Sequence, residues 1–283
     1  MKNLRIGIPS KGRLAEISAD LLKEAGLSFR RQERSLFARC REVPVDVTFL
    51  RTEDIPILCA EGAIDMGITG GDLIAEAGQK LASRLELGVG QCRLSLIVPE
   101  DSSITEPRQL DGRRVATSFP NVTSTFLESH GAKPHLVHLS GSVEIMISLG
   151  VADAIVDLVE TGSTLAANRL RILTDIDRYE TLLVQSPLCR ETETADRVVR
   201  RLEGVVIARS YSLLEYNIPK AKLAEAEKIT PGFNSPTVSA LEDAAWCAVR
   251  VMVRRTEVIS IMERLESLGA SAILETSITN CRL

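Results

Sequence analysis

The chain has 283 residues, of which 45% are apolar and 25% charged, a composition typical of a globular protein with room for two or three domains. Its formal net charge of −4 argues against a broad basic face, so nucleic acid is not an expected partner. No apolar stretch reaches the length of a membrane span, and the opening sequence MKNLRIGIPSKGRL lacks a signal peptide. We therefore expect a cytoplasmic protein, without membrane contact, that acts on small molecules.

Short apolar runs alternate with amphipathic segments as far as about residue 186, a pattern typical of a parallel or mixed sheet in an α/β fold. Strands are predicted at residues 4–8, 45–50, 64–69, 93–98, 113–118, 134–139, 153–159 and 181–186. Helices are predicted at residues 13–26, 121–131 and 142–150, each of which closes on a glycine. A glycine-rich interruption near residue 90 separates two similar strings of elements. Two α/β lobes around a cleft are therefore expected, with ligands at the carboxyl ends of the strands.

The pattern changes after a long helix predicted at residues 196–211. Strands and helices then follow in the order βαββαβ, at residues 212–218, 220–229, 237–242, 246–253, 256–269 and 270–278. This order is that of a ferredoxin-like domain. A compact third domain is therefore expected to begin near residue 210.

The cysteines and histidines give no sign of a metal site or a catalytic nucleophile. Six cysteines show no CxxC pair and no metal-ligand spacing, so reduced thiols in the core are expected. His135 and His138 are three residues apart in one predicted strand and so point to opposite faces, whereas His130 ends a helix. Nothing around these three histidines resembles a nucleophile motif.

The segment AIVDLVETGSTL, residues 154–165, begins as a buried strand that carries Asp157 and ends in a polar cluster. The cluster consists of Glu160, Thr161, Gly162, Ser163 and Thr164. Backbone N–H groups and hydroxyls at a helix start can bind an anion, and carboxylates accept hydrogen bonds from a sugar diol. The pattern thus favours a phosphosugar over free phosphate. A capped helix start after a turn remains the structural alternative.

Other strand-end loops supply cations and flexible glycine. They contain Lys11 and Arg13 after the first strand, Arg51 after the second, Gly71 and Asp72 after the third, and Arg93 at the start of the fourth. Each of these charges taken singly is typical of a solvated surface. Together, in a chain of negative net charge, they indicate a local anion-binding site.

The loop ATSFPN places Ser118 and Phe119 just before a helix start at Pro120. Two interpretations of Phe119 are open, because an aromatic ring in such a loop can stack on a nucleotide base or pack in the core. Core packing is the more frequent outcome for a single phenylalanine. Ser118 is a candidate for substrate contact in either case.

The sequence resembles the long form of ATP phosphoribosyltransferase from Leu4 to the C-terminus. The matching motifs are SKGRL, LRTEDIP, MGITGGDL, GQCRLSL, ATSFPN, GSVE, DAIVDLVETGSTL, PGFNSPTVSAL and LGASAIL. The resemblance implies two α/β lobes of the periplasmic-binding-protein type and a ferredoxin-like regulatory domain that binds histidine. It places catalytic lobe I at residues 1–90 and 179–209, lobe II at 91–178, and the regulatory domain at 210–283.

The family transfers the phosphoribosyl group of phosphoribosyl pyrophosphate to N1 of the adenine of ATP, releases pyrophosphate and forms phosphoribosyl-ATP. This is the first step of histidine biosynthesis. The resemblance assigns catalytic roles to Lys11, Arg13 and Arg51. It implies substrate contacts at Gly71, Asp72, Arg93, Ser118, Phe119, Asp157, Leu158, Glu160, Thr161, Gly162, Ser163 and Thr164. It also implies Mg²⁺ held mainly by the pyrophosphate of the substrate.

The expected histidine pocket, carried over from the family, consists of Asn217, Phe233, Thr237 and Ala272. From the bare sequence, a turn and core packing would account for the same residues. Two positions depart from the family pattern, because Phe119 stands where tyrosine is common and Asn217 where an acid is expected. The resemblance also implies a homo-oligomer, as a dimer and a hexamer.

Two other functions fit the same outline of domains. Prephenate dehydratases join a two-lobed core to a ferredoxin-like domain, but their Thr-Arg-Phe signature is absent here. A cytosolic two-lobed sensor of a small metabolite would usually carry a DNA-binding helix-turn-helix, and none is evident. The phosphosugar loop, not the fold, favours the transferase.

Overall fold

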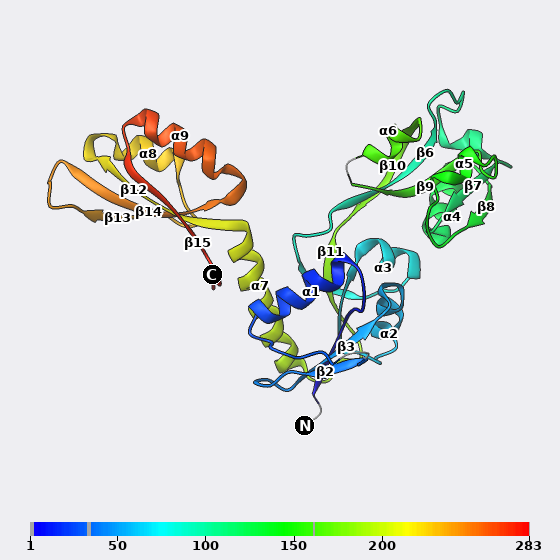
Figure 1. Cartoon of the computed structure of the whole chain (residues 1–283), viewed down its shortest axis with the longest axis horizontal. Helices are drawn as coiled ribbons and strands as arrows, with labels where there is room; N and C mark the ends of the chain where they lie inside the picture. Colours follow the sequence, from blue (N-terminus) through cyan, green and yellow to red (C-terminus); the bar gives the residue numbers. More distant parts are fainter. Residues whose placement is uncertain (1–2, 33–34, 161, 283) are drawn as a thin grey trace. The chain divides into compact units, whose positions relative to one another are not determined.

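The computed structural model describes residues 3–32, 35–160 and 162–282. The chain divides into two compact units, one made of Met1–Asp20 with Ser28–Ala195 and the other of Leu21–Leu27 with Asp196–Leu283. The first unit contains two mixed sheets and the second a four-stranded sheet (Figure 1). This confirms the α/β fold class expected from the alternating pattern.

The first sheet has six strands in the order β2-β3-β1-β4-β11-β5. They are β1 (Leu4–Pro9), β2 (Phe37–Arg39), β3 (Val45–Leu50), β4 (Met66–Gly70), β5 (Ala82–Glu86) and β11 (Thr181–Gln185). Strands β3 and β4 run parallel to β1 on its two sides, and β11 runs antiparallel to both β4 and β5. The chain therefore returns to this sheet after it has built the second one.

Three helices follow the parallel strands of the first sheet: α1 (Arg13–Glu24) after β1, α2 (Ile55–Ala60) after β3, and α3 (Gly71–Ala77) after β4. Buried Ile55 and Cys59 of α2 pack with Ile64 and Val184 in the core. Because β1, β3 and β4 are parallel, their carboxyl ends and the loops that follow lie along one edge of the sheet.

The second sheet has five strands in the order β10-β6-β9-β7-β8. They are β6 (Cys92–Pro99), β7 (Arg114–Thr117), β8 (His135–His138), β9 (Ala154–Val159) and β10 (Leu170–Tyr179). Strand β6 lies antiparallel between β10 and β9, whereas β7 is parallel to its neighbours β8 and β9. The sheet is thus built around β9, which has β6 on one side and β7 on the other.

Alternating side chains of β6 divide between two cores, one on each face of the second sheet. Leu94, Leu96 and Val98 pack on the face covered by α4 (Pro120–Ser129). Ile97 packs on the opposite face with Val159, where α5 (Ile145–Ser148) and α6 (Ser163–Ala167) lie. Ser95 shares this second face by alternation, and its hydroxyl donates to Asp175 Oδ1 of β10 at 2.8 Å.

All eight predicted strands of the first unit are present, with ends that shift by at most two residues. The largest of these shifts moves the start of one strand from residue 64 to Met66. Strands β2, β5 and β10 were not predicted. In β10 two register irregularities, at Ile172/Thr174 and Asp175/Asp177, break the alternation by which a strand is recognised in sequence. The helix predicted at 142–150 shortens to the single turn of α5.

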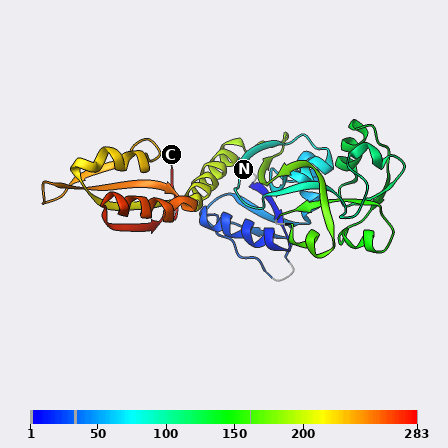
Figure 2. The same cartoon turned by 90° about the horizontal axis from the view of Figure 1, so that it is seen from above.

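The second unit contains all but the first turn of α7 (Thr192–Ser210), a helix that begins four residues before its predicted start. It also contains a four-stranded antiparallel sheet in the order β13-β14-β12-β15. Its strands are β12 (Tyr211–Pro219), β13 (Thr237–Ala240), β14 (Trp246–Arg254) and β15 (Ser271–Ser277). Helices α8 (Leu223–Ile229) and α9 (Val258–Leu268) lie side by side on one face (Figure 1, Figure 2). The expected ferredoxin-like βαββαβ order is thus confirmed.

The core of this domain lies between the sheet and its two helices. Leu214, Tyr216 and Ile218 of β12 are buried in this core. The Tyr216 hydroxyl lies 2.8 Å from Thr230 Oγ1. By alternation, Glu215 and Asn217 point to the other face of the sheet. Among the described residues of the domain, no helix covers that face.

None of the described helices is long and apolar enough to cross a bilayer. The six cysteines are free thiols, as expected. Only Cys40, Cys59 and Cys247 are buried, however, and the other three are partly exposed. The expectation of core thiols therefore holds for half of them.

Candidate active site

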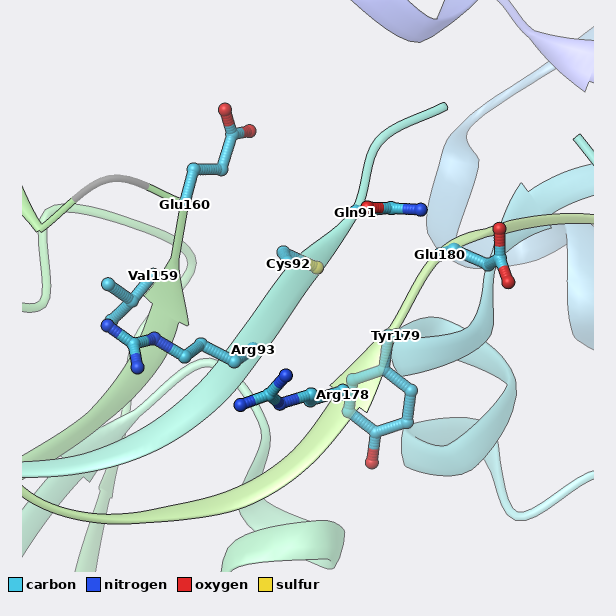
Figure 3. Close-up of a pocket in the computed structure, with 8 residues that line it drawn as sticks. All are labelled: Gln91, Cys92, Arg93, Val159, Glu160, Arg178, Tyr179 and Glu180. Atoms are coloured by element: carbon cyan, nitrogen blue, oxygen red, sulfur yellow. The ribbon is translucent and has the colours of Figure 1, made fainter. Parts of the chain in front are cut away.

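A pocket of about 530 Å³ lies where β6 begins, β9 ends and β10 ends (Figure 3). It is lined by Gln91, Cys92, Arg93, Val159, Glu160, Arg178, Tyr179 and Glu180. The strand register explains this convergence, since Arg93 of β6 is paired with Val159 of β9 on one side and with Arg178 of β10 on the other. Residues from three distant parts of the sequence thus meet at one end of the sheet.

The polar cluster that follows β9 lies directly beside this pocket. Gly162 has φ +79°, in the left-handed region that favours glycine. Apart from its two chain neighbours, no described residue has an atom within 4 Å of where a Cβ on Gly162 would be. Ser163 and Thr164 begin α6 and are exposed. Thr161 lies outside the described residues. The described part of the cluster is therefore an open turn with two accessible hydroxyl side chains.

Asp157 is half-buried in β9, opposite Ser95 of β6. Burial raises the pKa of this carboxyl, the N–H of Leu158 opposes the rise by donating to Asp157 Oδ1 at 2.8 Å, and the nearby Glu144 adds to it. The side chain of Leu158 packs on the opposite face, against the core under α4. Asp157 is thus a poorly solvated acceptor on the face that also carries Arg93 and Val159.

The two cations of the first loop are exposed, and one is paired with the loop after β9. Arg13, at the start of α1, places Nη2 2.5 Å from Glu160 Oε1, with side chains 69% and 53% exposed. An ion pair this exposed contributes little to stability, about 0 to 1 kcal/mol. Lys11 precedes Gly12, whose φ is +81°. A bound anion can therefore recruit Arg13 at little cost.

Arg51 is exposed immediately after β3, and its carbonyl accepts from the N–H of Asp54 at 3.1 Å. Across the described residues, no hydrogen bond or ion pair involves its guanidinium. By the parallel arrangement of β1 and β3, Arg51 lies at the same sheet edge as Lys11. The cations of the loops after β1 and β3 are thus at one edge of the first sheet, whereas Arg93 lies in the second sheet.

Gly71 holds the start of α3 against the segment that connects β10 to β11, and Asp72 follows it on the helix. The N–H of Gly71 donates to the carbonyl of Glu180 at 2.9 Å, and a Cβ on Gly71 would lie 3.3 Å from Tyr179 Cδ1. Asp72 is only 8% exposed, and burial raises its pKa against the opposing N–H groups of Asp72 and Leu73. Both residues lie next to the pocket, without lining it.

Phe119 is 6% exposed and belongs to the core with Leu94 and Leu127. Its N–H donates to Thr117 Oγ1 at 2.9 Å, which fixes the turn before α4. This placement favours packing over stacking on a base. Ser118, beside it, is partly exposed and remains accessible.

The thiol and the phenol of the pocket are protonated at neutral pH. Burial, with smaller contributions from Asp72 and Glu160, raises the pKa of the Cys92 thiol to about 11. Burial also raises the pKa of Tyr179 to about 12. Because a thiolate is the reactive form of cysteine, Cys92 has the wrong protonation state for a nucleophile.

No group of three or more potential ligand side chains able to hold a metal ion occurs among the described residues. The carboxylates near the pocket, Asp157 and Glu160, could complete the shell of an ion that a substrate already holds. These two carboxylates are oxygen donors of the kind that Mg²⁺ accepts.

The four residues expected to bind histidine line two separate pockets of the second unit. Asn217, Thr237 and Ala272 line a pocket of about 410 Å³ on the open face of the sheet. Phe233 lines another pocket of about 320 Å³, where its ring lies 5.3 Å from that of Tyr211. The three residues from β12, β13 and β15 converge, and Phe233 does not join them.

Of the eight residues that line the pocket, the sequence predicts only Arg93 and Glu160. The other six are Gln91, Cys92, Val159, Arg178, Tyr179 and Glu180. Arg178 and Tyr179 end the unpredicted strand β10. One feature of the sequence could have indicated these residues. The resemblance returns the chain to the first lobe near residue 179, so DRYE, residues 177–180, has to connect the two sheets.

Replacing Asp157 by Asn is expected to raise the melting temperature at pH 7. Because burial raises the pKa of this carboxyl, its charged form is less favourable in the folded chain than in the unfolded one. That cost is absent below the usual aspartate pKa of about 4 and appears as the pH rises through the raised value. The gain of D157N should therefore shrink toward pH 4, as followed by circular dichroism during heating.

Asp153, in the turn that leads into β9, supplies a control of opposite sign. Hydrogen bonds from Arg114 lower the pKa of Asp153, so its contribution to stability is present above the usual aspartate pKa and is lost as the pH falls through the lowered value. D153N should melt lower than the wild type at pH 7. A D157N protein that also melts lower than the wild type at pH 7 would contradict the cost assigned to Asp157.

Comparisons with known proteins identify the family. The model of the ATP phosphoribosyltransferase family matches residues 51–204, and that of the HisG C-terminal domain matches residues 208–280. The ATP phosphoribosyltransferase of Rhodopirellula baltica is 66% identical over 280 residues, 99% of this chain and 94% of the relative. That of Saccharopolyspora erythraea is 41% identical over 281 residues, 99% of this chain and 100% of the relative.

A solved structure gives the same result. The ATP phosphoribosyl transferase (HisG:HisZ) complex from Thermotoga maritima contains a chain that is 32% identical to this one. The two superpose with a TM-score of 0.66, over 72% of this chain and 98% of that one. With its additional C-terminal domain, this chain belongs to the long form of the ATP phosphoribosyltransferase family.

Proposed function

We propose that this chain transfers the phosphoribosyl group of phosphoribosyl pyrophosphate to N1 of the adenine of ATP, the first step of histidine biosynthesis. The products are phosphoribosyl-ATP and pyrophosphate. The observation that carries the proposal is the open turn after β9, where left-handed Gly162 and exposed Ser163 and Thr164 follow half-buried Asp157. In a member of this family, such a turn suits the phosphate and the ribose diol of the donor.

The proposed reaction requires no protein nucleophile, because the adenine nitrogen attacks the anomeric carbon as pyrophosphate departs. The protein must hold two polyanions in line and offset the charge that develops on the leaving group. We assign these tasks to Lys11, Arg13 and Arg51 on the first sheet. When bound, Mg²⁺ would add positive charge to the pyrophosphate, held mainly by the substrate itself.

We assign the binding of the phosphoribosyl group to the segment from Asp157 to Thr164. The low solvation of Asp157 strengthens the hydrogen bonds that it accepts from ribose hydroxyls. Glu160 would exchange Arg13 for the sugar, which releases the Arg13 guanidinium toward a phosphate. Gly71, Asp72, Arg93 and Ser118 are proposed to complete the surroundings of the substrates.

For regulation, we propose that residues 210–283 bind histidine in the pocket lined by Asn217, Thr237 and Ala272. The same pocket contains Glu215 and Arg250, whose Oε1 and Nε are 2.8 Å apart. A carboxylate and a guanidinium at this spacing complement the ammonium and carboxylate groups of an amino acid. Residues 1–90 with 179–209 and residues 91–178 are proposed as the two catalytic lobes.

We further propose that the enzyme acts in the cytoplasm, where ATP is available, as a homo-oligomer in dimeric and hexameric forms. The Thermotoga maritima relative was solved as a complex of HisG with HisZ, which supports assembly as a feature of the family. The edge strand β13 is exposed along its length and leaves backbone groups available for association.

The reaction is tested by mixing the protein with ATP, phosphoribosyl pyrophosphate and Mg²⁺, with pyrophosphatase added to draw the reaction forward. The N1-substituted adenine should give a rise in ultraviolet absorbance that requires both substrates. Prephenate with ATP omitted serves as the control for dehydratase activity. If the absorbance does not rise although calorimetry shows that either substrate binds, the protein is not the transferase. A sensor of a small metabolite would then be the remaining interpretation.

Replacing Arg51 by Ala is expected to lower kcat/KM by about ten-fold or more, because one charge-assisted contact to phosphate is lost. The free energy of unfolding should change by less than about 0.5 kcal/mol, since the exposed side chain makes no interaction among the described residues. Arg41→Ala removes another exposed arginine and should leave both quantities unchanged. Normal kinetics in R51A would remove Arg51 from the active site.

Replacing Arg250 by Met should raise the histidine concentration for half-inhibition by about ten-fold or more, because the inhibitor loses a charged contact. Turnover without histidine should be unaffected. Arg254→Met is the matched control, since Arg254 lies on the same strand but lines the pocket of Phe233. Weaker inhibition in R254M and not in R250M would move the histidine site to the Phe233 pocket.

A further inference from the structure

Arg178 is a pocket residue to which neither the sequence nor the family resemblance assigns a role. It stands directly opposite Arg93 in the antiparallel pairing of β10 with β6. Directly opposed residues of an antiparallel pair project to the same face of the sheet. In Figure 3 both guanidinium groups extend toward the same side, and the ring of Tyr179 points elsewhere. Two like charges in this arrangement are destabilising unless an anion lies between them.

The nearby acids leave this pair short of negative charge. Asp175 Oδ2 lies 3.4 Å from Arg93 Nη1, longer than a charge-assisted hydrogen bond of about 2.8 Å. The other carboxylate oxygen of Asp175 accepts from the Ser95 hydroxyl at 2.8 Å. Among the described residues, no side-chain hydrogen bond or ion pair involves the Arg178 guanidinium. The pair therefore retains N–H donors that have no protein partner among the described residues and line an open pocket.

The remaining carboxylates around the pocket are engaged elsewhere. Glu160 pairs with Arg13, and the carboxyl of Glu180 lies against Glu86 and the N–H of Gly88. Asp177 accepts from the N–H of Arg178 at 2.8 Å and lies on the other face of the sheet, where it lines a separate pocket. No described carboxylate is thus placed to neutralise Arg178.

Position along the sheet indicates which group the pair would bind. Arg93 is paired with Val159, the last residue of β9, and Asp157 is paired with Ser95 on the same face. With the sugar diol at Asp157 and its 5′-phosphate at the turn around Gly162, the arginines lie beside the place where a second, more distant phosphate group arrives. Because one guanidinium can bind a phosphate through two N–H groups, two adjacent guanidinium groups can each bind a different phosphate of a di- or triphosphate chain.

We propose that Arg93 and Arg178 form a polyphosphate subsite, a cross-strand pair of guanidinium groups bridged by the anion. This inference rests on the proposed transferase function and adds Arg178 to its substrate-binding residues. The chemistry can come from two sources, the pyrophosphate of the sugar donor or the triphosphate of ATP. Each source predicts a different kinetic signature.

The test compares full-length Arg178→Met with Arg190→Met, an exposed arginine in the loop after β11. R178M should raise the KM of one substrate by about 10- to 100-fold, the loss expected for a charged contact to phosphate. An increase for phosphoribosyl pyrophosphate, with an equal weakening of pyrophosphate binding in calorimetry, assigns the donor pyrophosphate. An increase for ATP alone, with AMP binding unchanged, assigns the triphosphate. R190M should behave as the wild type.

The R93M/R178M double variant tests the bridge itself. If one anion is shared, the loss in the double variant should be smaller than the product of the two single losses. R178M with wild-type KM values and wild-type pyrophosphate affinity, or with a fall in kcat alone, overturns the subsite. A wild-type protein without transferase activity would instead remove the proposed function, and pyrophosphate calorimetry would still decide whether Arg178 binds a polyphosphate.

Discussion

The antiparallel pairing of β6 with β10 is the interaction on which the site depends. It extends from Leu170↔Pro99 to Tyr179↔Cys92 and links the part of the chain that enters the second sheet to the part that leaves it. The same pairing sets Arg178 opposite Arg93, and the pairing of β6 with β9 adds Val159 and the turn beyond it. A register shift of one residue would move these side chains to the opposite face of the sheet, and the pocket would lose its lining.

The electrostatics of this site oppose stability and favour binding. Asp157 carries its charge in a half-buried position that raises its pKa, and the two paired arginines face each other without a full counter-charge. Arg13 and Glu160 are joined only by an exposed ion pair. In the free protein the ion pair adds little stability, and the half-buried carboxylate and the opposed arginines are unfavourable. A ligand that brings phosphates and hydroxyls gives each of these groups a better partner, so binding the ligand lowers the free energy of the site.

In the C-terminal domain, the alternation of side chains along β12 separates core residues from residues that line a pocket. Tyr216 and its neighbours on one face of β12 build the core under α8 and α9, while Glu215 and Asn217 on the other face remain available to a ligand. Carrying over four residues from a family treats them as one site. The structure instead separates Phe233 from the other three, because Phe233 lies in the loop between α8 and β13 and packs toward Tyr211.

The sequence by itself determined the order of the elements, the ferredoxin-like domain and the loop after β9, because apolar periodicity and turn residues are local properties. It could not reveal β10, whose two irregularities break the alternation. It also left Phe119 open between stacking and packing, which burial at 6% decides in favour of packing. Only the tertiary structure brought Arg178 beside Arg93, because the two residues belong to strands that are far apart in the sequence and pair in the sheet. Local sequence patterns do not reveal which distant strands pair.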